Sequence, residues 1–124
     1  MKALTQILWL DFPEEHDYPA AGDYLRLLFP NDIIEGYIGR LQGADISMFK
    51  AKDIFRASCL SLLGVSNMHV KRDQKKIKKG ILLSPLLLVR DPRTSRVIIA
   101  DGYHRLCAIY SLDEDAMIPC QITD

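Results

Sequence analysis

The sequence predicts an α/β protein of the α+β kind, in which a helical N-terminal part precedes a small mixed sheet with helices. Three observations predict this fold class. Apolar residues recur at helical spacing through the first half of the chain. Short apolar runs rich in branched side chains follow residue 85, and such runs are typical of buried strands. The 124 residues include no repeat or low-complexity linker, so we expect one domain over residues 1–124.

Residues 1–66 are expected to form the mainly helical part. The first ten residues are mostly apolar and predict a buried strand or arm. Residues 21–29 predict a helix that Pro30 ends, and Asn31 or Asp32 can cap a second helix. The side chains expected to face inward in these two helices are Ala21, Tyr24, Leu25, Leu28, Phe29, Ile34, Tyr37, Ile38 and Leu41.

A third helix is expected to begin after Ser47, which can cap it, and to end near Gly64. The three cysteines are odd in number and lack CxxC spacing, which predicts neither a disulfide framework nor a metal site. We expect reduced, buried thiols in a cytoplasmic protein. The inner face of the third helix would carry Ala51, Phe55, Cys59 and Leu62.

Residues 67–124 are expected to hold the sheet. Asn67 precedes a strongly basic helix that ends at Gly80, with Val70 and Ile77 as its inward anchors. The later elements expected from the pattern are strands at 86–89, 96–100 and 118–122 and a helix at about 103–112.

Charge is balanced overall but unevenly distributed. The chain has sixteen acidic and sixteen basic residues, so the whole molecule has no strong attraction to nucleic acid or membranes. Residues 1–48 carry eight acids and three bases, whereas residues 49–124 carry thirteen bases and eight acids. We therefore expect an anionic ligand to meet the second half. No apolar run approaches the ~20 residues that cross a membrane.

The segment Asp101-Gly102-Tyr103-His104-Arg105 is the part of the sequence best suited to chemistry. A buried strand ends at Asp101 and a helix begins within two residues, so the first N–H groups of that helix can bind an anion. Gly102 permits a positive φ and the close approach of another group. His104 and Arg105 add two donors, and an arginine can bind phosphate with two hydrogen bonds.

Two interpretations of this turn stay open. In the structural one, Asp101 is an N-cap, Gly102 is a turn residue, and His104 and Arg105 are ordinary surface residues. In the functional one, Gly102, Tyr103, His104 and Arg105 bind the ligand, while Asp101 and His104 are the catalytic candidates. A carboxylate repels a phosphate, so Asp101 suits such a site with Mg²⁺ or a hydroxyl group between them.

Four elements of the second half resemble the ParB/sulfiredoxin-like superfamily. These are the basic helix ending at Gly80, the Leu83-Ser84-Pro85 segment before a strand, the G-x-x-R turn from Gly102 to Arg105, and the late Ile118-Pro119 strand. Their order and spacing agree over residues 67–122. The resemblance implies a small mixed sheet and a turn that binds nucleotide phosphates, with ATP, ADP or CTP as the candidate nucleotide.

The branches of this superfamily differ at the turn. Sulfiredoxins have G-G-C-H-R there, with a catalytic cysteine, whereas this chain has Tyr103 in its place, and Cys107 lies a helical turn further on. ParB proteins have G-E-R-R and carry DNA-binding and dimerisation domains that this chain is too short to include. Free-serine kinases have a turn like D-G-H-x-R, which Asp101, Gly102, His104 and Arg105 match best.

Three functions remain to be weighed. The first is a domain that binds a nucleotide or phosphorylated small molecule, acting as a small phosphotransferase or nucleoside phosphate hydrolase. The second is a non-catalytic nucleic-acid-binding module that uses the basic helix, although no aromatic side chain interleaves its charges. The third is a non-catalytic protein-interaction module that uses the acidic N-terminal half.

Overall fold

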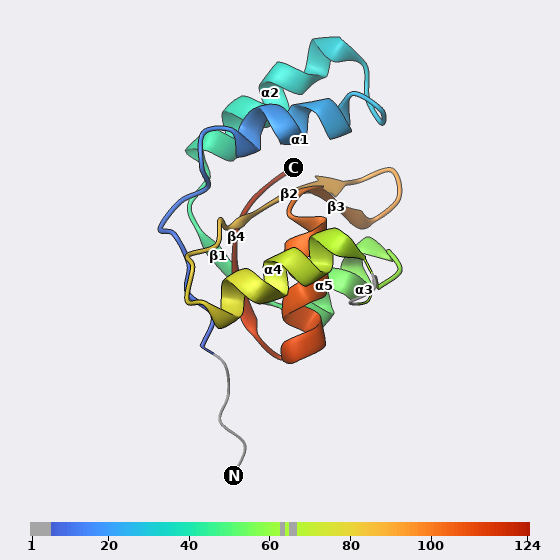
Figure 1. The fold of residues 1–124 in the computed structure, drawn as a ribbon. Coiled ribbons are helices and arrows are strands. Elements are labelled where there is room, and N and C mark those ends of the chain that lie inside the picture. The colour runs from blue at the N-terminus through green and yellow to red at the C-terminus, as the bar shows by residue number, and fades with distance from the viewer. Residues whose placement is uncertain (1–5, 63, 65–66) are drawn as a thin grey trace.

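The computed structural model describes residues 6–62, 64 and 67–124. It confirms the mixed α/β fold class, with helices and strands interspersed along the chain (Figure 1). In order they are α1 (Asp17–Leu25), α2 (Asn31–Gly43), β1 (Ser47–Lys50), α3 (Ala51–Ser58), α4 (Met68–Lys78), β2 (Leu86–Asp91), β3 (Arg96–Asp101), α5 (Tyr103–Leu112) and β4 (Met117–Thr123).

The four strands form one mixed sheet in the order β1-β4-β2-β3. β2 and β3 form an antiparallel hairpin, in which Leu88 lies opposite Ile99. β4 runs parallel to β2 on the other side and places Ile122 beside Leu88. β1 completes the sheet as an edge strand antiparallel to β4. The C-terminal strand therefore joins the hairpin to the N-terminal half of the chain.

Helices cover both faces of this sheet, as Figure 1 shows. Along β2, Leu86 and Leu88 pack with α3, α4 and α5 in one apolar cluster. Leu87 and Val89 point to the opposite face and pack with α1 and α2 in a second cluster. Successive strand residues face opposite sides, so a strand buried on both faces needs a continuous apolar run. This explains the uninterrupted run from Leu86 to Val89.

The N-terminal half differs from the prediction in one important element. Ser47 does not cap a helix, because Ser47–Lys50 is strand β1, paired with Met117–Cys120 of β4. α3 begins only at Ala51 and ends at Ser58, and Cys59 follows with a left-handed φ of 57°. The predicted continuation of this helix to Gly64 is wrong, since none of the described residues from Cys59 to Gly64 is helical. Pairing with β4 decides the structure here.

Smaller differences affect the side chains of the first three helices. α1 ends before the predicted stripe does, and Tyr24 and Leu28 are exposed. Pro30 rather than Asn31 or Asp32 occupies the N-cap position of α2, without a side-chain cap hydrogen bond. Two further side chains that were expected on the buried face of the third helix, Cys59 and Leu62, are exposed to solvent. Cys107 and Cys120 are buried as expected.

The elements of the second half lie close to their predicted positions. The side chain of Asn67 accepts hydrogen bonds from the N–H groups of His69 and Val70, which caps α4. Gly80 follows α4 with a φ of 72°. The N-terminal arm was predicted to be buried, but residues 7–10 are only half-buried, and the arm is held by a backbone hydrogen bond that Leu10 donates to Leu83 at 2.8 Å. Residues 1–5 of that arm lie outside the described part.

Among the described residues, the structure contains no helix with both the length and the apolar character that a bilayer span requires.

Candidate functional site

The turn between β3 and α5 is built around Gly102. Gly102 has φ 107° and occupies the N-cap position of α5, and its carbonyl accepts the first helical hydrogen bond from Leu106 at 2.9 Å. A Cβ atom at this position would lie 2.7 Å from Cγ of Leu86 and 2.9 Å from Nη2 of Arg105. Only glycine combines this φ with so close an approach. The turn therefore requires glycine for its own geometry.

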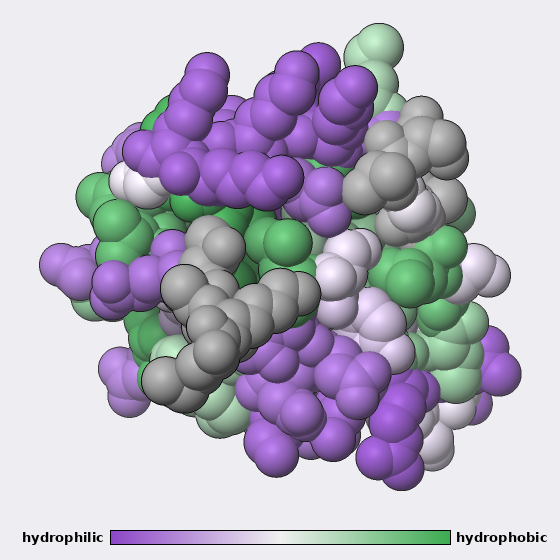
Figure 2. Space-filling view, turned by 60° about the horizontal axis from the view of Figure 1, so that its bottom comes forward, coloured by the Kyte–Doolittle hydropathy of each residue, from purple (hydrophilic) through white to green (hydrophobic). Residues whose placement is uncertain are grey.

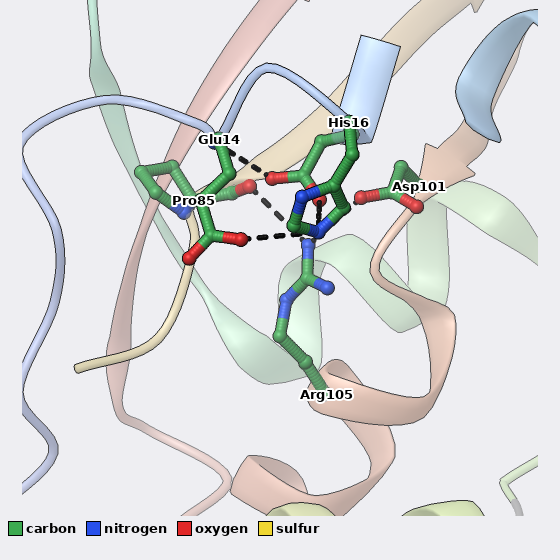
Figure 3. Close-up of polar contacts among 6 residues, drawn as sticks. Glu14, His16, Pro85, Asp101 and Arg105 are labelled. Atoms are coloured by element: carbon green, nitrogen blue, oxygen red, sulfur yellow. Dashed lines mark hydrogen bonds and ion pairs between the residues drawn. The ribbon is translucent and has the colours of Figure 1, made fainter. Parts of the chain in front are cut away.

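Arg105 points back across this turn toward the end of β3 (Figure 3). Its Nη2 donates to Oδ2 of Asp101 at 3.1 Å and to the carbonyl of Pro85 at 3.4 Å. Burial raises the pKa of Asp101, and the charge of Arg105 opposes that rise. Both side chains are largely buried, with 17% of Arg105 and 18% of Asp101 exposed. The Asp101 carboxylate is thus engaged by a neighbour within the turn.

The turn forms one wall of a pocket of about 160 Å³, and α4 forms the other. All five residues singled out in the sequence lie in its lining, together with four from α4. The lining residues are His69, Arg72, Asp73, Lys76, Asp101, Gly102, Tyr103, His104 and Arg105.

The N-terminus of α5 is open toward this pocket. No described side chain accepts a hydrogen bond from the N–H groups of Tyr103, His104 or Arg105. Such groups at a helix N-terminus carry the positive end of the helix dipole. The basic side chains of Arg72 and Lys76 face the same space from α4. The arrangement can therefore bind an anion by backbone donors and side-chain charge together.

His104 lies in the pocket with its ring against that of His69, at 4.8 Å between ring centroids. Burial lowers the pKa of His104, the nearby His69 lowers it further, and Asp73 opposes the shift. A neutral imidazole at pH 7 has one nitrogen free to accept a proton. Proton transfer is therefore chemically available to His104.

Tyr103 occupies the position where sulfiredoxins have their cysteine. Its hydroxyl group donates a hydrogen bond to the carbonyl of Ser61, in the segment that follows α3. Burial raises the pKa of the phenol, which keeps it protonated. The side chain thus connects α5 to the segment before α4 and brings no thiol to the pocket.

The sequence analysis missed the α4 wall of the pocket. His69, Arg72, Asp73 and Lys76 stand at spacings of three, four and seven residues, so they share one face of the helix. The sequence pattern of the basic run predicts only a nucleic-acid-binding surface as its possible function. The signal that could have revealed this wall is the helical spacing of two basic residues and one acid that lie between the buried Val70 and Ile77.

A second polar cluster lies beside Asp101 and Arg105, at the start of α1 (Figure 3). Nε2 of His16 lies 3.0 Å from Oε2 of Glu14 and 3.4 Å from Oδ1 of Asp17. These three side chains have the donor types and spacing that could hold a metal ion. The buried Asp17 carboxylate also accepts a hydrogen bond from the N–H of Glu14 at 2.9 Å, which closes the turn before α1. The three groups satisfy one another, so the cluster is explained by the structure of this turn.

Comparison of the chain with protein-family models, with curated proteins and with solved structures found no match in any of the three. The function proposed below therefore depends on the geometry of the pocket.

Proposed function

We propose that the pocket between α4 and α5 binds the phosphate group of a nucleotide or another phosphorylated small molecule. One observation carries the proposal, namely that the open N-terminus of α5 and basic side chains from two helices line the same small pocket. Arg72 and Lys76 contribute from α4, and Arg105 contributes from α5. Backbone N–H groups at a helix N-terminus together with such cations form a typical phosphate site.

The size of the pocket limits what it can enclose. Its volume of about 160 Å³ is well below the ~300–1,000 Å³ of typical sites for drug-sized ligands. We therefore expect the phosphate and the atoms next to it to lie inside, and the base of a nucleotide to extend outside. Arg105 contributes less than a free guanidinium would, because its Nη2 is paired with Asp101. The backbone donors and the two α4 cations supply the larger share.

Within this proposal the protein acts as a small phosphotransferase or a nucleoside phosphate hydrolase that works in the cytoplasm on ATP, ADP or CTP with Mg²⁺. Either reaction needs a group that takes a proton from a hydroxyl group or a water molecule. His104 is the candidate, because it lines the pocket and its pKa is lowered. Asp101 has the smaller role of holding Arg105 in place. His104→Ala would then abolish turnover while leaving phosphate binding largely intact.

A nucleic-acid-binding surface on α4 is the second candidate function. The helix exposes Lys71, Lys75, Lys78 and Lys79, and Figure 2 shows hydrophilic residues gathered along the upper edge of the molecule, where α4 lies. Arg72 and Lys76 line the pocket, however. The helix carries no Phe, Tyr or Trp on which a base could stack, and its one aromatic ring, that of His69, already packs against His104. Fluorescence anisotropy with DNA and RNA at physiological salt should show only weak, sequence-independent binding.

A charge-matched pair of variants tests the phosphate site. Lys76→Ala removes a cation from the pocket, whereas Lys75→Ala removes the same charge from the neighbouring residue outside it. Isothermal titration calorimetry with pyrophosphate, ATP, ADP and CTP should show affinity about tenfold weaker for Lys76→Ala, as expected for the loss of one charge-assisted interaction of ~1.4 kcal/mol. Lys75→Ala should bind like the wild type.

Two results would contradict the proposal. The first is that the wild-type protein releases no heat with any of the four ligands. The second is that Lys75→Ala weakens binding as much as Lys76→Ala, since a general effect of net charge then explains the affinity without a site. Repeating the titrations with and without Mg²⁺ shows whether the cation takes part.

A further inference from the structure

Asp73 is the one acidic side chain that α4 places in the pocket, and it lies among positive groups without a direct hydrogen bond or ion pair to any of them. It exposes only 9% of its surface and lines the pocket together with Arg72 and Lys76. No described residue makes a hydrogen bond or an ion pair with its carboxylate at hydrogen-bonding distance. Its oxygens are not fully buried, so water in the pocket can hydrate them. A ligand that fills the pocket displaces that water, and it must then offer the carboxylate a hydrogen-bond donor or a cation, because a desolvated carboxylate without one costs free energy.

The part of the ligand that contacts Asp73 cannot be its phosphate, because two anions repel each other. The carboxylate can meet either a cation or a hydroxyl group of the ligand. Burial raises the pKa of Asp73, and the surrounding charges of Arg105, Lys76, His104 and Arg72 oppose that rise. A divalent metal ion placed against Asp73 would face those same positive groups.

The ligand count also disfavours a metal ion at Asp73. Mg²⁺ prefers six oxygen ligands, often including one or two carboxylates. The other carboxylate in the lining is Asp101, and Arg105 already engages it at 3.1 Å. A hydroxyl group needs only one acceptor oxygen and adds no positive charge. The surroundings of Asp73 therefore favour a hydroxyl group.

We propose that Asp73 accepts a hydrogen bond from a hydroxyl group of the ligand, so that the pocket selects phosphate monoesters of polyols, such as a sugar phosphate or the ribose end of a nucleotide. The proposal rests on the phosphate site proposed above. From a phosphate bound at the N–H groups of α5, an esterified carbon chain that extends toward the α4 wall meets Asp73, which lies between Arg72 and Lys76 in the lining. The small volume keeps the hydroxyl-bearing carbons close to the phosphate. Asp73 is thus a specificity-determining residue.

Two phosphate esters of equal chain length separate the hydroxyl contact from the phosphate contact. Glycerol 3-phosphate carries two hydroxyl groups, and propyl phosphate carries none. The wild-type protein should bind glycerol 3-phosphate and ribose 5-phosphate at least about tenfold more tightly than propyl phosphate, as one charge-assisted hydrogen bond implies. The affinities are measured by isothermal titration calorimetry without metal ions and again with Mg²⁺.

Variants of Asp73 should remove this preference without removing phosphate binding. Asp73→Leu has similar size and no acceptor, so it should bind the three esters alike and bind propyl phosphate more tightly than the wild type does, because a nearby negative charge is gone. Asp73→Asn keeps the shape and an uncharged acceptor, and its preference should be intermediate. Asp53→Asn on α3 removes a carboxylate away from this pocket and should leave the preference unchanged.

The outcomes distinguish the two proposals. If the wild-type protein binds neither inorganic phosphate nor any ester, the phosphate site itself is wrong. If it binds propyl phosphate as tightly as glycerol 3-phosphate, or if the preference survives in Asp73→Leu, the site stands and the role of Asp73 is wrong. If Mg²⁺ tightens binding in the wild type and not in Asp73→Asn, the carboxylate holds a cation and the hydroxyl contact is refuted.

Discussion

Replacing Gly102 by alanine tests how tightly the turn before α5 is constrained. A Cβ atom there would lie 2.7 Å from Cγ and 3.1 Å from Cδ1 of Leu86, whose side chain is fully buried and cannot move aside. Overpacking a core in this way costs about 1–3 kcal/mol. The φ of 107° adds strain of about 1–3 kcal/mol for a residue with a Cβ atom. We therefore expect Gly102→Ala to lower the free energy of unfolding by about 2–6 kcal/mol, a large part of the ~5–15 kcal/mol of a typical domain.

The measurement is urea unfolding followed by circular dichroism, with thermal unfolding as a second probe. Gly39→Ala in α2 is the matched control, because a Cβ atom at Gly39 meets no other atom within 4 Å. That change should be stabilising by about 0.5–1 kcal/mol, since alanine favours a helix. A Gly102→Ala variant whose free energy of unfolding lies within ~1 kcal/mol of the wild type would show that the described geometry of the turn is wrong.

Two further predictions concern stability away from the pocket. Asn67→Ala should lower the free energy of unfolding by about 1 kcal/mol, because it removes the side-chain cap of α4, whereas Asn31→Ala should change it little because that side chain caps nothing. Denaturant titration of both variants checks this, and an equal effect of the two would contradict it. Hydrogen bonds from Arg93 lower the pKa of Asp91 below its ordinary value of 3.8. Their stabilising effect is therefore present in full above pH ~4 and is lost as the pH falls through the lowered pKa. Asp91→Asn should flatten the acid limb of a plot of stability against pH, and an unchanged acid limb would refute the role of this pair.

The second half of the fold could be predicted because its signals are local and strong. Asn67 and Gly80 mark the two ends of α4, and the run from Leu86 to Val89 fits only a strand buried on both faces. β1 could not be predicted in this way. Its four residues are too few to show an alternating pattern, and the strand exists because β4 offers a paired edge far along the chain. Tertiary pairing outweighed local preference there.

The candidate site also has one part that local signals predict and one part that depends on tertiary packing. The Asp101–Arg105 segment is contiguous, so the strand end, the glycine and the helix N-terminus could be predicted together from the sequence. The α4 wall lies about thirty residues earlier in the sequence. The residues of α4 that line the pocket alternate with lysines that do not line it, so the sequence alone does not distinguish them. Nor does the sequence show that Arg105 turns back to Asp101, because an i,i+4 pair depends on where the helix begins. The position of Asp73 among the positive groups of both helices is visible only once α4 and α5 are packed together.

The position of β4 has a consequence for how the chain folds during its synthesis. β4 is inserted between β1 and β2, so neither of those strands has its full set of backbone partners until residues 117–123 have left the ribosome. Until then β1 and one side of β2 are open strand edges, which can pair with other chains. The β2–β3 hairpin and the helices can form earlier from local contacts. The sheet is therefore completed only when β4, the last of its four strands in sequence, has been made, and a chain that stops before β4 keeps α3 and β1 without the strand that joins them to the rest.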